Sequence, residues 1–356
     1  YKASDTVPSN GYKLNQDKSY CAVNGNKDNS ITFDYENKLV NVYGLGKKGT
    51  KCYLYFDSYA CKGISCESIM ANMNTIKTRS DFNTTLTDTT SGVIYKSLNS
   101  NQYDDYGETY YFAGAPTDNW VKFGGFYWRI IRINGDGTIR MIYNGPTTDQ
   151  TGETTQIGTS AFNTNYNDNM YVGYQYTSGE VHGRGTDSTI KGVLDNWYNN
   201  NLSGYANKIA TSNGATFCND RTPYSGRGTG TTATDYAASY RLITNKVPTF
   251  KCTDTKDRFA TSVGLITADE VAYAGGAVWS NNSGYYLYTG QYYWTMSPSG
   301  FNSDNSRAYV FYVNTGGSLG PDIVGWDAPG ARPVINLKAD VALTGTGTAS
   351  DPYIVS

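Results

Sequence analysis

Alternating hydrophobic and polar residues recur along the chain, and this pattern predicts β-strands. FYWRIIRI at 126–133 and TIRMIYN at 138–144 flank the turn NGDG at 134–137, which predicts a β-hairpin. Near the C-terminus, GTGTASDPYIV at 345–355 predicts a turn followed by a closing strand. Much of the expected fold is therefore β-sheet.

Three other segments carry apolar residues at helical spacing. They are SCESIMANMNTIKTR at 65–79, DSTIKGVLDNWYNNNL at 187–202 and TADEVAYAGG at 267–276. The residues expected on the apolar faces are Ile69, Met70, Met73 and Ile76 in the first segment, and Ile190, Val193, Leu194 and Trp197 in the second.

The expected N-caps of these helices are short polar residues. Ser65 precedes the first helix, and Asp187 or Ser188 precedes the second. Thr267 and Glu270 have the spacing of a capping box at the start of the third, which ends at Gly275 or Gly276.

The pattern changes character near residue 58, which predicts two domains. Residues 1–57 hold strand-like segments separated by turns and predict a small all-β module, for which an immunoglobulin-like sandwich is one option. Residues 58–356 form the second domain. Two insertions, near 146–186 and 219–250, are rich in Gly, Thr, Asn and Tyr and are longer than ordinary connections.

Charge and composition narrow the class of protein. With 29 basic and 31 acidic residues the net charge is -2, so no basic field attracts phosphates and no nucleic-acid partner is expected. The 33 tyrosines and 39 glycines are typical of secreted β-rich proteins and of binding surfaces. No apolar run is long enough to cross a membrane, and no signal peptide is visible. We therefore expect an ectodomain whose membrane or wall anchor lies upstream.

The six cysteines include no CxxC pair, which argues against a zinc ribbon or a thioredoxin-type site. Their positions along the chain predict three local disulfides, which require an oxidising compartment. The expected pairs are Cys21 with Cys52, Cys61 with Cys66, and Cys218 with Cys252.

Residues for catalysis are few. His182 is the one histidine, and no GxSxG motif supplies a nucleophilic serine. Asp104 and Asp105, or Asp269 and Glu270, are candidate carboxylate pairs for glycoside hydrolysis, but the first lies in a polar turn and the second in the first turn of a helix. We expect no enzyme, no metal and no cofactor, with calcium in a loop left open.

Several segments carry a resemblance to a known family. They are FYWRIIRINGDGTIRMIY, VLDNWYNNNL, YYWTMSP and GARPVINLKADVALTGTGTASDPYIV. The chain resembles C-type-lectin-fold domains of the formylglycine-generating-enzyme-like branch, and among them the variable proteins of bacterial and phage diversity-generating retroelements. The resemblance covers about residues 58–345 and is most specific in the last sixty. The positions that match the framework of these domains are Trp294, Pro298, Val310, Val313, Arg332, Pro333, Val334 and Leu337.

This resemblance implies an α+β fold, in which an antiparallel sheet with two or three helices and long loops follows the small all-β module. It also implies that residues between the framework positions vary and bind ligand. The motifs of oxygen-activating and calcium-dependent sugar-binding relatives are not matched: Trp326-Asp327-Ala328-Pro329 departs from the sugar-binding pattern.

The predicted ligand-binding surface is the region 299–329. The strand-like AYVFYVN at 308–314 places Tyr309 and Tyr312 on opposite faces, and polar loops at 299–307 and 315–330 lie on either side of it. The candidate binding residues are Ser299, Asn302, Asp304, Asn305, Arg307, Tyr309, Tyr312, Asp322, Trp326 and Asp327. We expect an extracellular or cell-surface adhesin that binds a protein or glycan ligand on another cell or host surface.

Two other functions are compatible with the sequence. A carbohydrate-binding or carbohydrate-active protein would use Tyr171, Tyr174 and Tyr176 of the first insertion to stack on sugar rings. A pilus or fibre subunit would use the N-terminal module to polymerise.

Overall fold

The computed structural model describes residues 11–36, 39–44 and 47–355 of the chain. Strands hold 34 % of the residues and helices 16 %, in several separate sheets. The expected α+β C-type-lectin-like fold is therefore wrong, because the protein is predominantly β-sheet. The insertions 146–186 and 219–250 contribute to this difference: they contain short strands rather than loops alone, since Thr and Tyr favour extended backbone.

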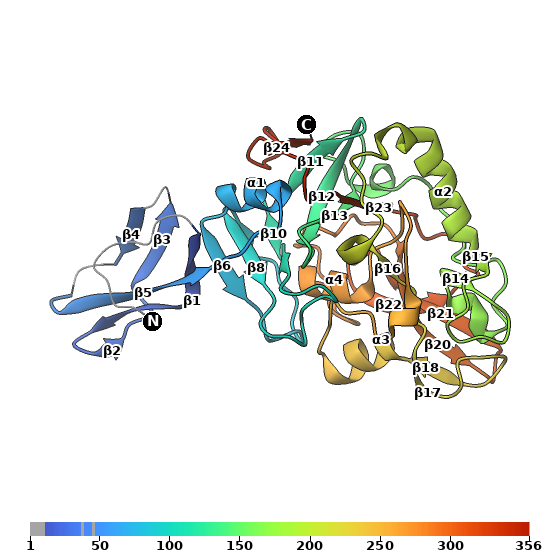
Figure 1. Cartoon of the computed structure of the whole chain (residues 1–356). Helices are drawn as coiled ribbons and strands as arrows, with labels where there is room; N and C mark the ends of the chain where they lie inside the picture. The colour runs from blue at the N-terminus through green and yellow to red at the C-terminus, as the bar shows by residue number, and fades with distance from the viewer. Residues whose placement is uncertain (1–10, 37–38, 45–46, 356) are drawn as a thin grey trace.

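The largest sheet has twelve strands and runs through most of the molecule (Figure 1). Its strands are β1 (Tyr12–Val23), β2 (Asn26–Lys27), β5 (Thr50–Ser58), β6 (Thr75–Thr78), β8 (Val93–Lys96), β9 (Tyr110–Tyr111), β11 (Trp120–Phe123), β12 (Phe126–Ile133), β13 (Ile139–Tyr143), β23 (Val334–Leu337), β24 (Leu343–Thr344) and β25 (Tyr353–Val355). The predicted hairpin is confirmed as the antiparallel pair β12–β13, and the predicted closing strand as β25, which pairs with β24.

A second sheet of five strands carries the C-terminal candidate surface. In spatial order its strands are β17 (Pro223–Ser225), β18 (Thr234–Tyr236), β20 (Tyr293–Asn302), β21 (Arg307–Val313) and β22 (Leu319–Ile323). The remaining strands form two-stranded pairs: β3 (Thr32–Glu36) with β4 (Leu39–Tyr43), β7 (Thr89–Thr90) with β10 (Ala115–Pro116), β14 (Gln175–Tyr176) with β15 (Thr186–Asp187), and β16 (Phe217–Cys218) with β19 (Arg258–Phe259).

The helices are short and lie between the strands. They are α1 (Ile64–Asn72), α2 (Thr189–Asn201), α3 (Ala237–Ser239) with the π-helical turn η5 (Tyr240–Asn245), and α4 (Ala268–Ala274). Single 3₁₀ turns are η1 (Gly152–Thr155), η2 (Asn169–Val172), η3 (Ser203–Tyr205), η4 (Asn213–Ala215) and η6 (Thr255–Asp257).

Two of the three predicted helix starts are confirmed. Ser188 caps α2 by accepting a hydrogen bond from the backbone N–H of Lys191. Thr267 and Glu270 form the predicted capping box of α4. The prediction for the first helix is partly wrong: Gly63 precedes α1 without a side-chain cap, and the expected helical residue Ile76 lies in β6. A β-branched residue flanked by Thr75 and Thr78 favours the strand.

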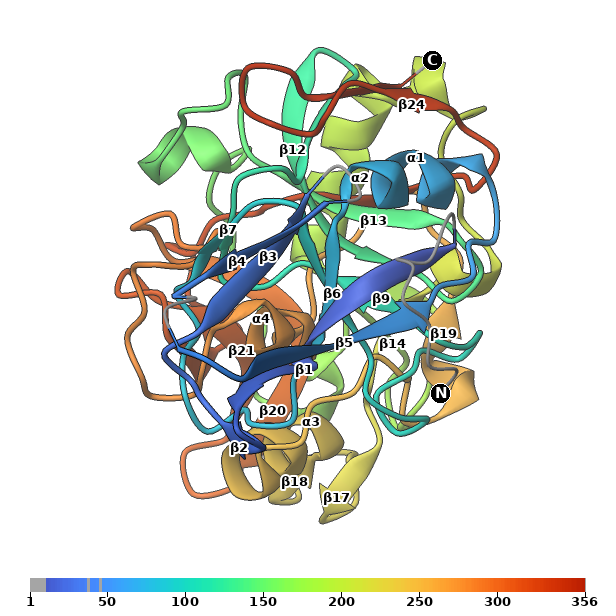
Figure 2. The same cartoon turned by 90° about the vertical axis from the view of Figure 1, so that its left-hand side faces the viewer.

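The N-terminal strands form a lobe at one end of the molecule, which Figure 2 views from that end. The disulfide between Cys21 and Cys52 joins β1 to β5 within this lobe. β1 also pairs in parallel with β6, Leu14 lying opposite Thr75, so the main sheet continues across the predicted boundary near residue 58. The first ten residues of the predicted module lie outside the described residues.

A buried network of ion pairs connects α4 to the centre of the main sheet. Glu270 Oε1 lies 2.9 Å from Arg132 Nε and 2.6 Å from Arg140 Nε, and all three side chains are at least nine-tenths buried. Arg132 Nη1 also lies 3.2 Å from Asp104 Oδ2. Burial alone raises the pKa of Glu270, but the charges of Arg140 and Arg132 outweigh it, so the pKa falls below its ordinary value.

Asp269, the neighbouring acid of α4, forms an ion pair with another arginine. Arg241 Nη2 lies 2.8 Å from Asp269 Oδ2 and 2.6 Å from Asp220 Oδ2. The two carboxylates of α4 thus hold β12, β13 and η5 around one helix. Asp105 Oδ2 lies 3.8 Å from Arg258 Nη1. All four acids of the two candidate catalytic pairs, Asp104 with Asp105 and Asp269 with Glu270, therefore lie beside arginines in the fold.

We expect Glu270→Gln to lower the free energy of unfolding by about 3–5 kcal/mol, because it leaves Arg132 and Arg140 buried without their shared carboxylate. A carboxylate with a lowered folded pKa stabilises above its unfolded pKa and loses that contribution as the pH falls. The variant should therefore also lose part of the acid sensitivity of the wild type. Denaturant titrations at several pH values measure both effects. Glu67→Gln, on the exposed side of α1, is the matched control; equal losses in the two variants would contradict the assignment.

Candidate functional site

The predicted loop 299–307 is largely a strand. β20 continues to Asn302, and only residues 303–306 form the turn to β21. Asn302 Oδ1 accepts the backbone N–H of Asp304 at 2.8 Å, and Ser306 has a left-handed φ of 52°. The long-loop expectation is therefore wrong: an Asn side chain and one left-handed residue are enough for a four-residue turn.

The second predicted loop, 315–330, also contains a strand. Its residues Leu319–Ile323 form β22, the edge of the five-stranded sheet. In the register with β21, Tyr312 lies opposite Gly320 and Tyr309 lies opposite Ile323. Because directly opposed residues of an antiparallel pair point to the same face, the sheet has a Tyr312 face and a Tyr309 face.

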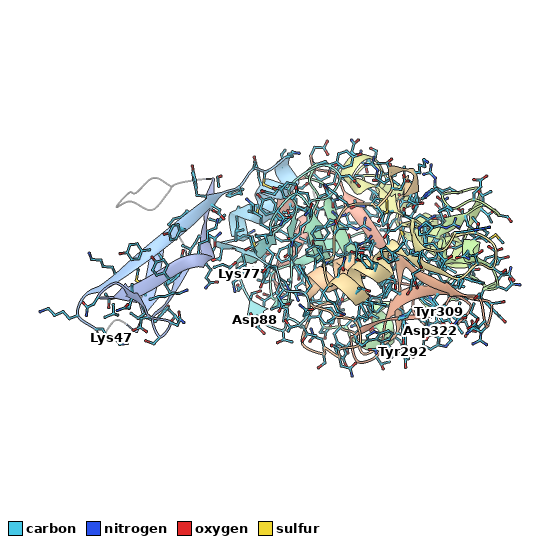
Figure 3. The ribbon with its side chains drawn as sticks, turned by 90° about the horizontal axis from the view of Figure 1, so that it is seen from below. Lys47, Lys77, Asp88, Tyr292, Tyr309 and Asp322 are labelled. Carbon is cyan, nitrogen blue, oxygen red and sulfur yellow. A yellow bond between two sulfur atoms is a disulfide. The ribbon has the colours of Figure 1, made fainter. Side chains whose placement is uncertain are left out.

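Three aromatic side chains meet on the Tyr312 face, at the end of the molecule away from the N-terminal lobe (Figure 1). The ring of Trp326 lies 4.8 Å from that of Tyr292 and 5.7 Å from that of Tyr312, both edge-on. All three are half-buried, with Trp326 and Tyr312 packed partly against the main core. Figure 3 labels Tyr292, Asp322 and Tyr309 at this end of the molecule. Trp326 therefore both supports the sheet and contributes accessible aromatic surface.

Trp279 extends this set, and sequence analysis missed it. Its side chain is 65 % exposed and its φ is 62°, a left-handed conformation that costs energy for a Trp. The backbone N–H of Trp279 donates to the Leu319 carbonyl at 3.0 Å, and its ring lies over Gly320, where a Cβ would come within 3.0 Å of it. The signal was present in VWSNNSG at 278–284, a large aromatic followed by turn residues.

We call Trp279, Tyr292, Tyr312 and Trp326 the aromatic face. Asp322 lies on the same side of the sheet, and burial first and the Asp322 charge second raise the pKa of Tyr312. The face thus combines broad apolar rings with hydroxyl groups and one carboxylate, a composition typical of recognition surfaces.

The predicted site residues do not share one surface. Arg307 and Tyr309 lie on the other face of the sheet, where Asn305 Nδ2 contacts the Tyr309 hydroxyl at 3.3 Å. Asn302, Asp304 and Asp327 are exposed, whereas Ser299 is only 5 % exposed and is closed off from ligand. Regular alternation along β21 decides the sides of Arg307 and Tyr309, whereas Ser299 lies at a bulge of β20, which is not visible in the sequence.

Arg307 is available for a partner. It is exposed, and its side chain makes no hydrogen bond or ion pair with any residue that the structure describes, although its backbone pairs with Asn302 in the sheet. It projects at the start of β21, next to the exposed turn. An unpaired guanidinium at such a place offers several donors to an incoming ligand.

The insertion residues are less suited to binding. Tyr174 is fully buried, so its expected role in sugar stacking is wrong, while Tyr171 and Tyr176 form an edge-on pair 5.4 Å apart at the surface. His182 Nδ1 lies 3.1 Å from the buried Asp257 Oδ2 and Nε2 lies 3.6 Å from Asp254 Oδ2. This histidine joins the first insertion to η6.

The comparisons add no relative from which a role can be transferred. Searches with models of protein families, among curated proteins and among solved structures find no match for the chain. The compartment and class of the protein must therefore be inferred from its own structure. All three predicted disulfides are confirmed, Cys21–Cys52, Cys61–Cys66 and Cys218–Cys252, and they indicate an extracellular or other non-cytoplasmic compartment. Within the described ranges no helix has the length and apolarity to cross a membrane.

The exposure of Trp279 is testable by fluorescence. The chain has six tryptophans, of which Trp120, Trp128 and Trp294 are at most 7 % exposed. We expect Trp279→Phe to remove most of the acrylamide-quenchable emission and to leave the free energy of unfolding within about 0.5 kcal/mol, as for surface substitutions generally. Trp128→Phe is the buried control. Unchanged quenching in Trp279→Phe would show that the ring is covered in solution.

Proposed function

We propose that the protein is a secreted or cell-surface recognition protein that binds a macromolecular partner through its C-terminal sheet. It does so without chemistry, by equilibrium contact with the aromatic face and the turn 303–306 of the same sheet. The observation that carries this proposal is a group of four accessible aromatic rings on one face of the five-stranded sheet. They belong to Trp279, Tyr292, Tyr312 and Trp326.

Three properties of this surface support a binding role. Trp and Tyr give large contact area for a small loss of side-chain entropy. The strands below them are buried, with Val310 and Phe311 fully inaccessible, so the rings are held in fixed positions. At the β20–β21 end of the same sheet, the exposed residues Asn302, Asp304 and Arg307 offer further hydrogen-bonding groups.

Substitution of the aromatic face tests the proposal. Fluorescently labelled full-length protein is screened against arrays of extracellular protein domains and of glycans, and Tyr312→Ala and Trp326→Ala are compared on the best partner. We expect a loss of affinity of about tenfold or more for each, because buried aromatic anchors dominate such interfaces. Tyr12→Ala, 47 % exposed on β1, is the control and should bind as the wild type.

Because the two rings also touch the core, unfolding curves of each variant must accompany the binding data. Retained binding by stable Trp326→Ala protein would refute the proposal. Loss of glycan binding in Tyr171→Ala, with no effect at Tyr312, would favour a carbohydrate-binding role of the insertion.

We further propose that this surface is diversified, as in variable proteins of retroelements. In that case copies of the protein from one genome should differ mainly at the exposed positions Asn302, Asp304, Asn305, Arg307 and Asp327. The buried framework residues Trp294 and Arg332 should stay constant, because each is fully enclosed and hydrogen-bonded to backbone carbonyls. Sequencing of such copies is the measurement, and differences spread evenly over the chain would contradict it.

A further inference from the structure

A polar groove on the main sheet lies outside the aromatic face. It has a volume of about 360 Å³ and lies between β10, β11, β12 and the segments 148–151 and 283–288. Its lining includes Pro116, Trp120, Arg129, Asn144 and Tyr286. The groove uses none of the four residues of the aromatic face.

The groove contains a buried arginine without an acidic partner. Arg129 is 8 % exposed, and its guanidinium lies 4.1 Å above the ring of Trp120 and 5.2 Å from that of Tyr286. Nε donates to Asn119 Oδ1 and Nη2 to the Pro116 carbonyl. Among the described residues no carboxylate lies within ion-pair distance of Arg129. The charge of Asp118 raises the pKa of Arg129 by less than burial lowers it, and Asp118 Oδ2 accepts the backbone N–H of Gly92.

The third guanidinium nitrogen is left for a ligand. Nη1 has no hydrogen-bond partner in the described part of the chain, and it keeps contact with the groove rather than being enclosed. Burial lowers the pKa of Arg129 to about 9, and the nearby charge of Arg332 lowers it as well. The side chain is therefore still cationic at neutral pH.

Two further polar groups in the wall lack partners. Asn144 Oδ1 accepts from Arg332 Nη2 at 3.1 Å, so its Nδ2 remains a free donor on the groove side. The hydroxyl of Tyr286 is buried and has no hydrogen-bond partner among the residues that the structure describes. Arg332 itself is fully buried, and it too has no carboxylate within ion-pair distance in the described part of the chain. The wall thus carries the positive charges of Arg129 and Arg332 and several unpaired hydrogen-bond donors. A buried charge or donor without a partner is energetically unfavourable.

We propose that this groove is a binding site for a sugar acid, whose ring carboxylate is held by Arg129 Nη1 and Asn144 Nδ2. A charged guanidinium N–H suits a carboxylate oxygen. The half-buried Tyr288 provides a ring surface of the kind on which sugars stack, and Thr148, Gln150 and Ser283 at the rim provide hydroxyl and amide groups for sugar hydroxyls. Asp149 on the same rim disfavours anions of higher charge such as sulfate and phosphate.

The test is a titration of the full-length protein with glucuronate, followed by ligand-detected NMR. We expect binding in the roughly millimolar range of a single charge-assisted site, and at least about tenfold weaker binding of the neutral methyl ester of glucuronate, because the carboxylate contact is lost. N-acetylglycine has a carboxylate but no sugar ring, and sulfate has neither a carboxylate nor a ring. Both should compete poorly with glucuronate. Equal binding of the ester, or equal competition by N-acetylglycine or sulfate, would overturn the assignment.

Two exposed aspartates provide a matched pair of variants. Asp149→Asn removes a negative charge from the groove rim and should tighten glucuronate binding about threefold, in line with the effects of exposed charges. Asp340→Asn makes the same change at an exposed position outside the groove lining and should have no effect. Identical behaviour of the two variants would count against the site.

Arg129→Lys keeps the charge but cannot hold Asn119, Pro116 and the ligand together, so we expect affinity to fall about tenfold or more. If this variant does not fold, Thr148→Glu places a carboxylate at the half-buried groove wall and should weaken glucuronate by a similar factor. Unchanged affinity in the folded variant would overturn the proposal. Failure here leaves the aromatic-face proposal standing, because the two experiments use different residues and ligands.

Discussion

The structure depends on the burial of Glu270 between Arg132 and Arg140. A carboxylate so deeply enclosed is stable only with cations beside it, so α4 can occupy just one position against β12 and β13. The adjacent Asp269 engages Arg241 and thereby positions η5 and the 219–250 insertion. A helix of seven residues is short, but its two acids, its capping box and its fully buried sequence make it a fixed point between the two sheets.

From this fixed point the candidate surface follows. Ser297 of β20 accepts the backbone N–H of Ala268 in α4, so the five-stranded sheet is attached to the same helix. β21 and β22 then extend outward from β20 and expose one edge. Rigid support of this kind favours recognition, because rings that are already in place lose little entropy on binding.

The two proposed sites use the segment 285–293 from different sides. Tyr286 and Tyr288 border the sugar-acid groove, and Tyr292 belongs to the aromatic face. The buried Tyr293 between them lies under the Arg332 guanidinium, which also donates to the Leu287 carbonyl. Arg332 therefore has two consequences: it fixes this aromatic segment, and it adds positive charge behind the groove.

Local interactions could be predicted from the sequence alone. The sequence shows the turn of the β12–β13 hairpin and the capping residues Ser188 and Thr267 directly. It also predicts the three disulfides, because each joins cysteines that follow one another along the chain. Long-range pairing decided the rest. The parallel contact of β1 with β6 and the placement of Trp279 over Gly320 depend on segments far apart in sequence. The family resemblance predicted an α+β fold. In the structure the extended Thr- and Tyr-rich segments pair with other strands and form sheet instead. A strand is stabilised mainly by the strands beside it rather than by its own residues.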